Sequence, residues 1–148
     1  MYGTIADLLN EKGRQVYTIS RAATVRDAVG EMNEKGVGAL LIMNGAEPVG
    51  IFTERDVLRR VVHVARDPTI THVVEVMTPH PIVARSDMRV EEAMSMMTSK
   101  RVRHLPAVDA TGAVVGMVSI GDVMRWVTIH QQSDIEHMTD YITGRHPA

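Results

Sequence analysis

The sequence contains no cysteine, few aromatic residues and no long apolar run. With no cysteine among its 148 residues, the chain cannot form disulfides, offer a thiolate nucleophile or hold zinc through sulfur. Its longest apolar run, Ala39–Met43, is far too short to span a bilayer. The net charge of −2 gives no global attraction to nucleic acid or to an anionic membrane.

The N-terminal stretch MYGTIADLLNEKGRQ also lacks a basic segment followed by a long apolar core. No secretory signal is therefore expected. From these absences we expect a cytoplasmic protein that binds neither nucleic acid nor a membrane.

Motifs of the common catalytic and metal sites are missing as well. The sequence contains no HExxH, no G-x-S-x-G, no G-x-x-x-x-G-K-[ST] and no G-x-G-x-x-G. Zinc hydrolysis, a serine nucleophile elbow, NTP hydrolysis and a Rossmann site are therefore not indicated. His130 and His137 are seven residues apart, not the three or four that place two ligands on adjacent helical turns. We expect no catalytic residue and no metal site.

The most informative feature that is present is an internal duplication. An offset of 65 aligns Val25 with Val90, Ala28 with Ala93, Met32 with Met97 and Leu40 with Leu105. After one inserted residue, an offset of 66 aligns Gly50 with Gly116 and Asp56 with Asp122. Because solenoids need about three or more repeats, two copies predict a duplicated domain with pseudo-two-fold symmetry. We expect a first unit with a lead-in helix over residues 1–66, a linker with a short helix over 67–80, a second unit over 81–128, and a C-terminal helix extension and tail over 129–148.

Each copy predicts the order β-α-β-β-α, an α/β fold. In the first copy, Thr24 with Asp27 is a capping box that starts a helix ending at Gly36. Strands are expected at 16–19, 38–43 and 48–52, and a further helix begins at about Thr53. In the second copy the corresponding elements are expected at 82–84, 90–100, 103–108 and 113–118, again followed by a helix. Arg89 replaces the capping threonine there, so Ser86 or Asp87 is expected to cap.

The duplicated junctions GIFTERDVLRR, from Gly50, and GMVSIGDVMRW, from Gly116, allow two interpretations. In the first, Thr53 with Asp56 and Ser119 with Asp122 are capping boxes that only stabilise helix starts. In the second, the hydroxyl and the free N–H groups hold a phosphate, and the carboxylate accepts both hydrogen bonds of a ribose diol. The two interpretations are not exclusive.

The paired pattern resembles a tandem pair of CBS domains, the Bateman module. The resemblance rests on GALLIMNGAEPVGIFTERDVLR, on VRHLPAVDATGAVVGMVSIGDVM and on the approach VVEVMTPHPIVA. It covers nearly the whole chain and implies two units whose sheets pack face to face. It further implies a non-catalytic sensor that binds adenosine-containing ligands between its halves: AMP as first choice, then ADP, ATP, NAD or S-adenosylmethionine.

The resemblance also implies roles for individual residues. Asp56 and Asp122 match the ribose-binding aspartates, and Thr53 and Ser119 match the phosphate-contacting hydroxyls. Each cleft in the family combines the aspartate junction of one repeat with strands of the other. The implied neighbours of Asp122 are Val16, Tyr17, Gly38 and Ala39; those of Asp56 are Thr78, Ile82, Arg103 and His104.

The two clefts are expected to differ in charge. Arg55 beside Asp56 is matched by Gly121 beside Asp122. The Asp56 cleft would thus gather Arg55, Arg103 and His104 and tolerate more negative charge, which predicts that it is the tighter site. Lys100 and Arg101 are more simply interpreted as a solvated helix end, where cations complement the helix dipole. For Arg103, this interpretation and a role in the cleft both stay open.

The output of such a sensor would go to a separate, unidentified effector protein. The resemblance implies a homodimer, and the apolar stripe after Trp126, formed by Ile129, Ile135 and Met138, would suit such an interface. An alternative stays open: a structural or dimerisation module that has no physiological nucleotide.

Overall fold

The computed structural model describes the backbone of residues 3–143 and the side chains of residues 3–131. Its helices are α1 (Ile5–Lys12), α2 (Val25–Lys35), α3 (Glu54–Asp56), the π-helical η1 (Val57–Val62), α4 (Val73–Val76), α5 (Val90–Lys100) and α6 (Ile120–Thr143). Its strands are β1 (Ala39–Asn44), β2 (Glu47–Thr53), β3 (Thr78–Pro79), β4 (Ala84–Arg85), β5 (His104–Val108) and β6 (Val114–Ser119).

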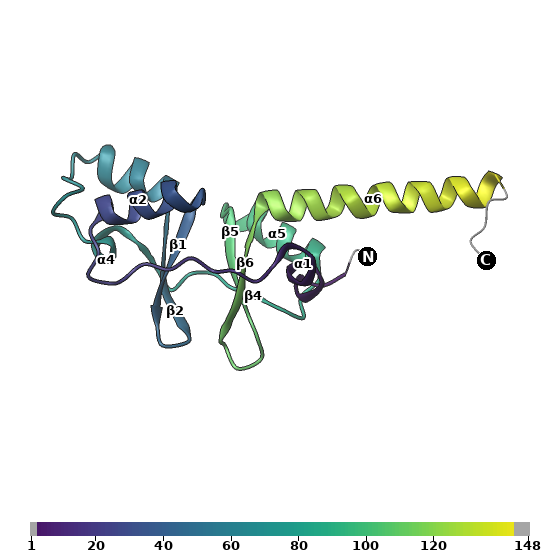
Figure 1. Ribbon diagram of the computed structural model, residues 1–148, viewed down its shortest axis with the longest axis horizontal. Helices are drawn as coiled ribbons and strands as arrows, with labels where there is room; N and C mark the ends of the chain where they lie inside the picture. The colour runs from purple at the N-terminus through teal and green to yellow at the C-terminus, as the bar shows by residue number, and fades with distance from the viewer. Residues whose placement is uncertain (1–2, 144–148) are drawn as a thin grey trace.

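The strands form two three-stranded sheets, one for each copy of the repeat (Figure 1). The first has the order β1-β2-β3 with antiparallel pairs, and the second has the order β4-β5-β6, in which β4 runs parallel to β5. The strand predicted at 16–19 is reduced to a single bridge, because only Thr18 pairs with Leu41 of β1. The predicted α/β fold with two repeated units is confirmed.

Helix α2 starts and ends where its sequence predicts. The Thr24 side chain accepts from the Asp27 amide, the Asp27 side chain accepts from the Thr24 amide, and Gly36 ends the helix in the left-handed conformation (φ 66°). Its buried residues, Val25, Ala28 and Met32, lie on one face at helical spacing.

The prediction that Ser86 or Asp87 caps helix α5 is wrong. Arg89 is the N-cap residue and makes no side-chain capping bond. Instead, the first amide of the helix, that of Val90, donates to the carbonyl of Gly3 at 3.0 Å. A backbone group from the other end of the chain thus satisfies an N–H that a local side chain was expected to cap.

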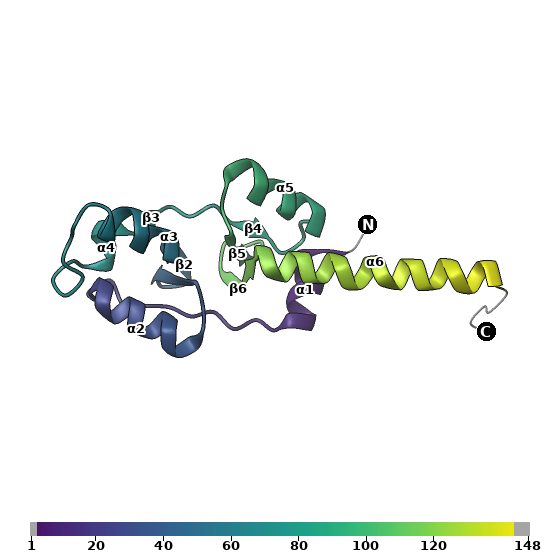
Figure 2. The ribbon, with the colours of Figure 1, turned by 90° about the horizontal axis from the view of Figure 1, so that it is seen from above.

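Each lead-in helix packs on the unit other than the one that directly follows it in the sequence. Helix α1 buries Ile5, Leu8 and Leu9 in the core of the second unit, while α4 buries Val73 and Val76 in that of the first. Figure 2 shows the same crossing, with α1 beside α6 and α4 near α2. The domain boundaries predicted along the sequence stay a prediction. In the folded structure, the core of the second unit includes α1 and the core of the first unit includes α4.

The two sheets pack face to face, as the resemblance implied. A small apolar cluster joins Ala39, Leu41 and Ile51 of the first sheet to Val114 and Met117 of the second. Because sheets that pack in this way exclude water only where their inner faces meet, the ends of the contact leave room for clefts between the units.

Helix α6 continues beyond the packed units as a projecting rod (Figure 1). Of the apolar stripe predicted on it, Ile129 is exposed, at 43% of its surface. The side chains of Ile135 and Met138 lie outside the described residues. Within residues 3–143, no helix is both long enough and apolar enough to cross a membrane.

Candidate functional site

Two clefts lie between the units, and each contains one of the duplicated aspartates. The Asp56 cleft has a volume of about 440 Å³ and the Asp122 cleft a volume of about 550 Å³. Both volumes are in the range of small-molecule sites.

The Asp56 cleft brings together all the residues that the resemblance implied for it. They come from the β2–α3 junction, from the segment around β3 and from the start of β5: Thr53, Arg55, Asp56, Thr78, Ile82, Arg103 and His104. Arg59 and Arg101 also line this cleft but were not predicted for it. The helix-end interpretation of Arg101 still holds, because this residue caps α5 in the left-handed conformation (φ 54°).

The Asp122 cleft matches its prediction in part. Tyr17, Gly38, Ala39, Ser119 and Asp122 line it, whereas Val16 and Gly121 do not. Val16 packs instead against the cluster between the sheets. Gly121 adjoins the wall, because a Cβ at this position would lie 3.7 Å from Ser119 Oγ.

Asp56 is a buried carboxylate held by its own junction. Its Oδ2 accepts from the Thr53 amide at 2.9 Å, and Thr53 Oγ1 accepts from the Asp56 amide at 3.3 Å. The capping interpretation is therefore confirmed at this position. Thr78 Oγ1 lies 3.4 Å from Asp56 Oδ1, and Arg60 Nε lies 3.6 Å from the same oxygen. The cap does not remove the carboxylate from the cleft, since Asp56 still lines it.

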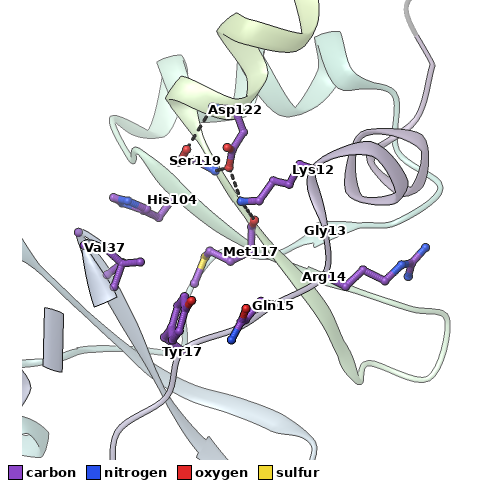
Figure 3. Close-up of a pocket in the computed structure, with 13 residues that line it drawn as sticks. Lys12, Gly13, Arg14, Gln15, Tyr17, Val37, His104, Met117, Ser119 and Asp122 are labelled. Carbon is purple, nitrogen blue, oxygen red and sulfur yellow. Dashed lines mark hydrogen bonds and ion pairs between the residues drawn. The ribbon is translucent and has the colours of Figure 1, made fainter. Parts of the chain in front are cut away.

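Asp122 has the same cap and one additional partner. Its Oδ2 accepts from the Ser119 amide at 2.8 Å, and Ser119 Oγ accepts from the Asp122 amide at 3.1 Å. Lys12 Nζ lies 2.5 Å from that carboxylate oxygen and also donates to the Met117 carbonyl at 2.7 Å (Figure 3). Burial raises the pKa of Asp122, but hydrogen bonds from Lys12 and Ser119 outweigh it and leave the pKa below its ordinary value.

Lys12 was missed because it belongs to the lead-in helix of the other unit. A signal for it does exist in the sequence. The lead-in segments align Ile5 with Val73 at an offset of 68, and the same offset aligns Lys12 with His80. His80 lines the Asp56 cleft. The duplication thus aligns in sequence two basic residues, each of which lines one cleft, and using this signal requires knowing that the lead-in helices cross.

His104 and Gly38 form a wall shared by the two clefts, since both residues line both cavities. Burial lowers the pKa of His104 below its ordinary value, and the carboxylates of Glu54 and Asp122 offset only part of this effect. Lys12 and Arg103 lower it further. Burial therefore favours the neutral imidazole, in which one ring nitrogen donates and the other accepts.

Arginines dominate the charge of the Asp56 cleft. Arg55, Arg59, Arg101 and Arg103 line it, against the carboxylates of Glu54 and Asp56. The Arg55 guanidinium donates to the Arg101 carbonyl at 3.0 Å, so it also ties the junction to the end of α5. Such a surplus of guanidinium groups suits a ligand with several anionic oxygens.

In the part of the chain that the structure describes, no three His, Asp or Glu side chains converge as ligands for a metal ion.

Comparison with known proteins gives a consistent family assignment. The family model of the CBS domain matches residues 5–63 and 73–129. The chain is 35% identical over 150 residues to the mitochondrial CBS domain-containing protein CBSX3 of Arabidopsis thaliana, covering 95% of this chain and 72% of that protein. The chain spans a smaller share of two other curated relatives: 58% of one from Methanopyrus kandleri and 15% of one from Schizosaccharomyces pombe, each 35% identical over 76% of this chain.

Solved structures agree with this assignment. A putative signal-transduction protein with CBS domains from Burkholderia ambifaria superimposes with a TM-score of 0.79 at 40% identity, covering 84% of this chain and 93% of the other. A CBS domain protein from Pyrobaculum aerophilum, solved in complex with AMP, superimposes with a TM-score of 0.72 at 27% identity, covering 80% and 88%.

Proposed function

The chain belongs to the CBS-domain family as a tandem CBS pair, and on this premise we propose that it is a non-catalytic sensor that binds adenosine-containing ligands. The observation that carries the proposal is the Asp56 cleft. A buried carboxylate, a hydroxyl and a group of arginines converge there on one cavity between the units. AMP is the first candidate ligand, and the AMP complex of the Pyrobaculum aerophilum relative supports it. ATP and NAD are further candidates, as is S-adenosylmethionine.

In this proposal each group of the Asp56 cleft has a role that its chemistry allows. Asp56 accepts the two hydrogen bonds of the ribose diol, as acidic residues do in dinucleotide folds. Thr53 contacts the first phosphate, and Arg59 and Arg103 stabilise the negative charge of the phosphate chain. The aliphatic side chain of Ile82, which is 38% exposed, covers one face of the adenine.

Ligand binding between two units has a direct structural consequence. A ligand that contacts both units stabilises one relative arrangement of them, so its binding free energy shifts the equilibrium between arrangements. A separate effector protein would detect this shift. A cytoplasmic location stays a prediction, and the Arabidopsis thaliana relative is named as mitochondrial.

A thermal-shift titration tests the proposal. A ligand that binds only the folded protein adds about 2.7 kcal/mol of stability at 100 times its Kd. We expect AMP, ADP or ATP to raise the melting temperature in a concentration-dependent manner, with NAD and S-adenosylmethionine tested in parallel. If all five ligands leave the melting curve unmoved at millimolar concentration, the protein is not an adenosyl sensor.

The alternative function, a dimerisation module without a physiological nucleotide, has its own supporting observation. Met124 and Ile129 on α6 are exposed, at 60% and 43% of their surfaces, and α6 projects from the units (Figure 2). Sedimentation of the protein without nucleotide separates the two functions. A stable homodimer together with a flat thermal-shift titration favours the module, whereas ligand-dependent stability favours the sensor.

A further inference from the structure

The two aspartates are equivalent in the repeat but not in their surroundings. Asp56 is held by hydroxyls of Thr53 and Thr78, and Arg60 on its own helical segment lies 3.6 Å away. Asp122 instead pairs with the ammonium of Lys12, which reaches it from a helix of the other unit. Among the described residues, the cation in contact with Asp122 is thus Lys12, whereas the cation nearest Asp56 is Arg60 of its own segment.

The Lys12 ammonium is anchored rather than loose. It donates to Asp122 Oδ2 at 2.5 Å and to the Met117 carbonyl at 2.7 Å. Two of its three protons are thereby used. Figure 3 shows Lys12 extending from the side of α1 toward Asp122, with Tyr17 and Val37 at the opposite side of the cleft.

Lys12 donates to the same carboxylate that a bound ribose would need as an acceptor. A vicinal diol donates two hydrogen bonds, and a carboxylate binds it best when both oxygens accept freely. At Asp122, Oδ2 already accepts from the Ser119 amide and from Lys12. A ribose that uses both oxygens must therefore displace the lysine from Oδ2 or share that oxygen with it, while Oδ1 stays available.

A ligand can displace Lys12 at a small cost in free energy, because the ion pair between Lys12 and Asp122 is not deeply buried. The side chains of Lys12 and Asp122 are 31% and 25% exposed, and ion pairs with partial exposure are weak. Lys12 is therefore expected to weaken ribose binding without abolishing it.

We propose that Lys12 is a specificity-determining residue, which competes with the ribose diol for Oδ2 of Asp122 and so weakens adenosine binding in the Asp122 cleft. This inference rests on the proposed function, since it concerns the same class of ligand. It gives a residue of α1 a part in ligand binding at the Asp122 cleft, separate from the arginines around Asp56.

Nuclear magnetic resonance with labelled methyl groups tests the inference cleft by cleft. The methyl group of Met117 reports on the Asp122 cleft and that of Ile82 on the Asp56 cleft, because each lines only its own cavity. The probe is adenosine, which carries the diol but no phosphate. The wild-type protein is compared with Lys12→Met, with Lys12→Arg, and with Lys100→Met as a control at a lysine outside both clefts.

In Lys12→Met, the Kd of adenosine measured at Met117 should fall by about two- to fivefold, the range that corresponds to loss of a partly exposed ion pair. The Kd measured at Ile82 should not change. Lys12→Arg keeps the cation and should keep the wild-type Kd, and Lys100→Met should change neither value. Urea unfolding of each variant verifies that it is folded.

Three outcomes overturn the inference in different ways. If Lys12→Met leaves the Kd at Met117 unchanged, the lysine does not compete for Asp122. If the Kd rises, and rises more for AMP than for adenosine, Lys12 is a phosphate ligand instead. If neither methyl group responds to adenosine or AMP in any of the proteins, the proposed function itself is wrong.

Discussion

The side chain of Leu9 in α1 lies directly against the Cα of Gly116 in β6. A Cβ at position 116 would come within 2.7 Å of Leu9 Cδ2. The same relationship recurs in the first unit, where a Cβ on Gly50 would overlap Met77. The glycine that opens each duplicated junction is therefore required for close approach of a lead-in helix to the sheet.

Gly116→Ala should lower the free energy of unfolding by about 1–3 kcal/mol, because the added methyl group overpacks a core with no space for it. Gly50→Ala should cost less, since the flexible side chain of Met77 can move aside. Urea unfolding measures both changes. Gly30→Ala is the control: it lies within α2 with open space around it, so it should raise stability by about 0.5–1 kcal/mol. A Gly116→Ala protein as stable as the wild type would contradict the close contact between Leu9 and Gly116.

A comparison of the capping boxes at Thr24 and Thr53 separates the effect of a cap on stability from its effect on ligand binding. Thr24→Ala and Thr53→Ala each remove a hydroxyl that caps a helix, so each should lower the free energy of unfolding by about 0.5–2 kcal/mol. Only Thr53 lines a cleft, so only Thr53→Ala should also weaken AMP binding in isothermal titration calorimetry. Equal affinities in the two variants would show that the hydroxyl of Thr53 is a cap alone.

Stability should depend on pH through His104. Its pKa is lowered in the folded protein by burial, while in the unfolded chain it is about 6.5. The unfolded state therefore binds the proton more readily, and the contribution of His104 to stability is complete above pH 6.5 and lost as the pH falls below it.

Urea unfolding at pH 7.5 and pH 5.5 measures this dependence. The wild-type protein should lose more stability between these values than His104→Gln, in which the titrating group is absent and the other groups are retained. The groups that face His104 are Glu54, Asp122, Lys12 and Arg103. Identical losses in the two proteins would mean that His104 does not titrate differently on folding.

The arginines of the Asp56 cleft should make the protein favour ligands with more phosphate groups, such as ATP, over AMP. Replacing both Arg59 and Arg103 with glutamine should weaken ATP binding about three- to tenfold more than AMP binding, because only ATP extends a phosphate chain along them. Isothermal titration calorimetry measures the ratio of the two affinities. Arg21→Gln, at an exposed position outside both clefts, should leave the ratio unchanged. A parallel loss of AMP and ATP would place these arginines at the first phosphate rather than along the chain.

The fold and the two duplicated junctions were predictable from the sequence because the duplication repeats local signals, whereas the neighbours of Asp56 and Asp122 were implied only by the resemblance to the CBS family. The capping box at Thr24 and the junctions at Thr53 and Ser119 depend on residues a few positions apart. The spacing of the second copy then confirms the first.

What the sequence did not predict depends on contacts between distant segments. The amide of Val90 finds its partner in the Gly3 carbonyl, so local capping rules failed at α5. Lys12 reaches Asp122 only because α1 packs on the second unit. The hydrophobic pattern of α1 does not predict on which of two similar cores this helix packs.

The central claim is that Asp56 binds ribose as well as capping a helix, and one pair of variants tests it most directly. Asp56→Asn and Asp27→Asn each replace the carboxylate of a capping box, but only Asp56 lines a cleft. AMP affinity is measured at the Ile82 methyl group. The account predicts at least a tenfold loss in Asp56→Asn, as expected for lost hydrogen bonds to a charged group, and wild-type affinity in Asp27→Asn. Wild-type affinity in Asp56→Asn would contradict it.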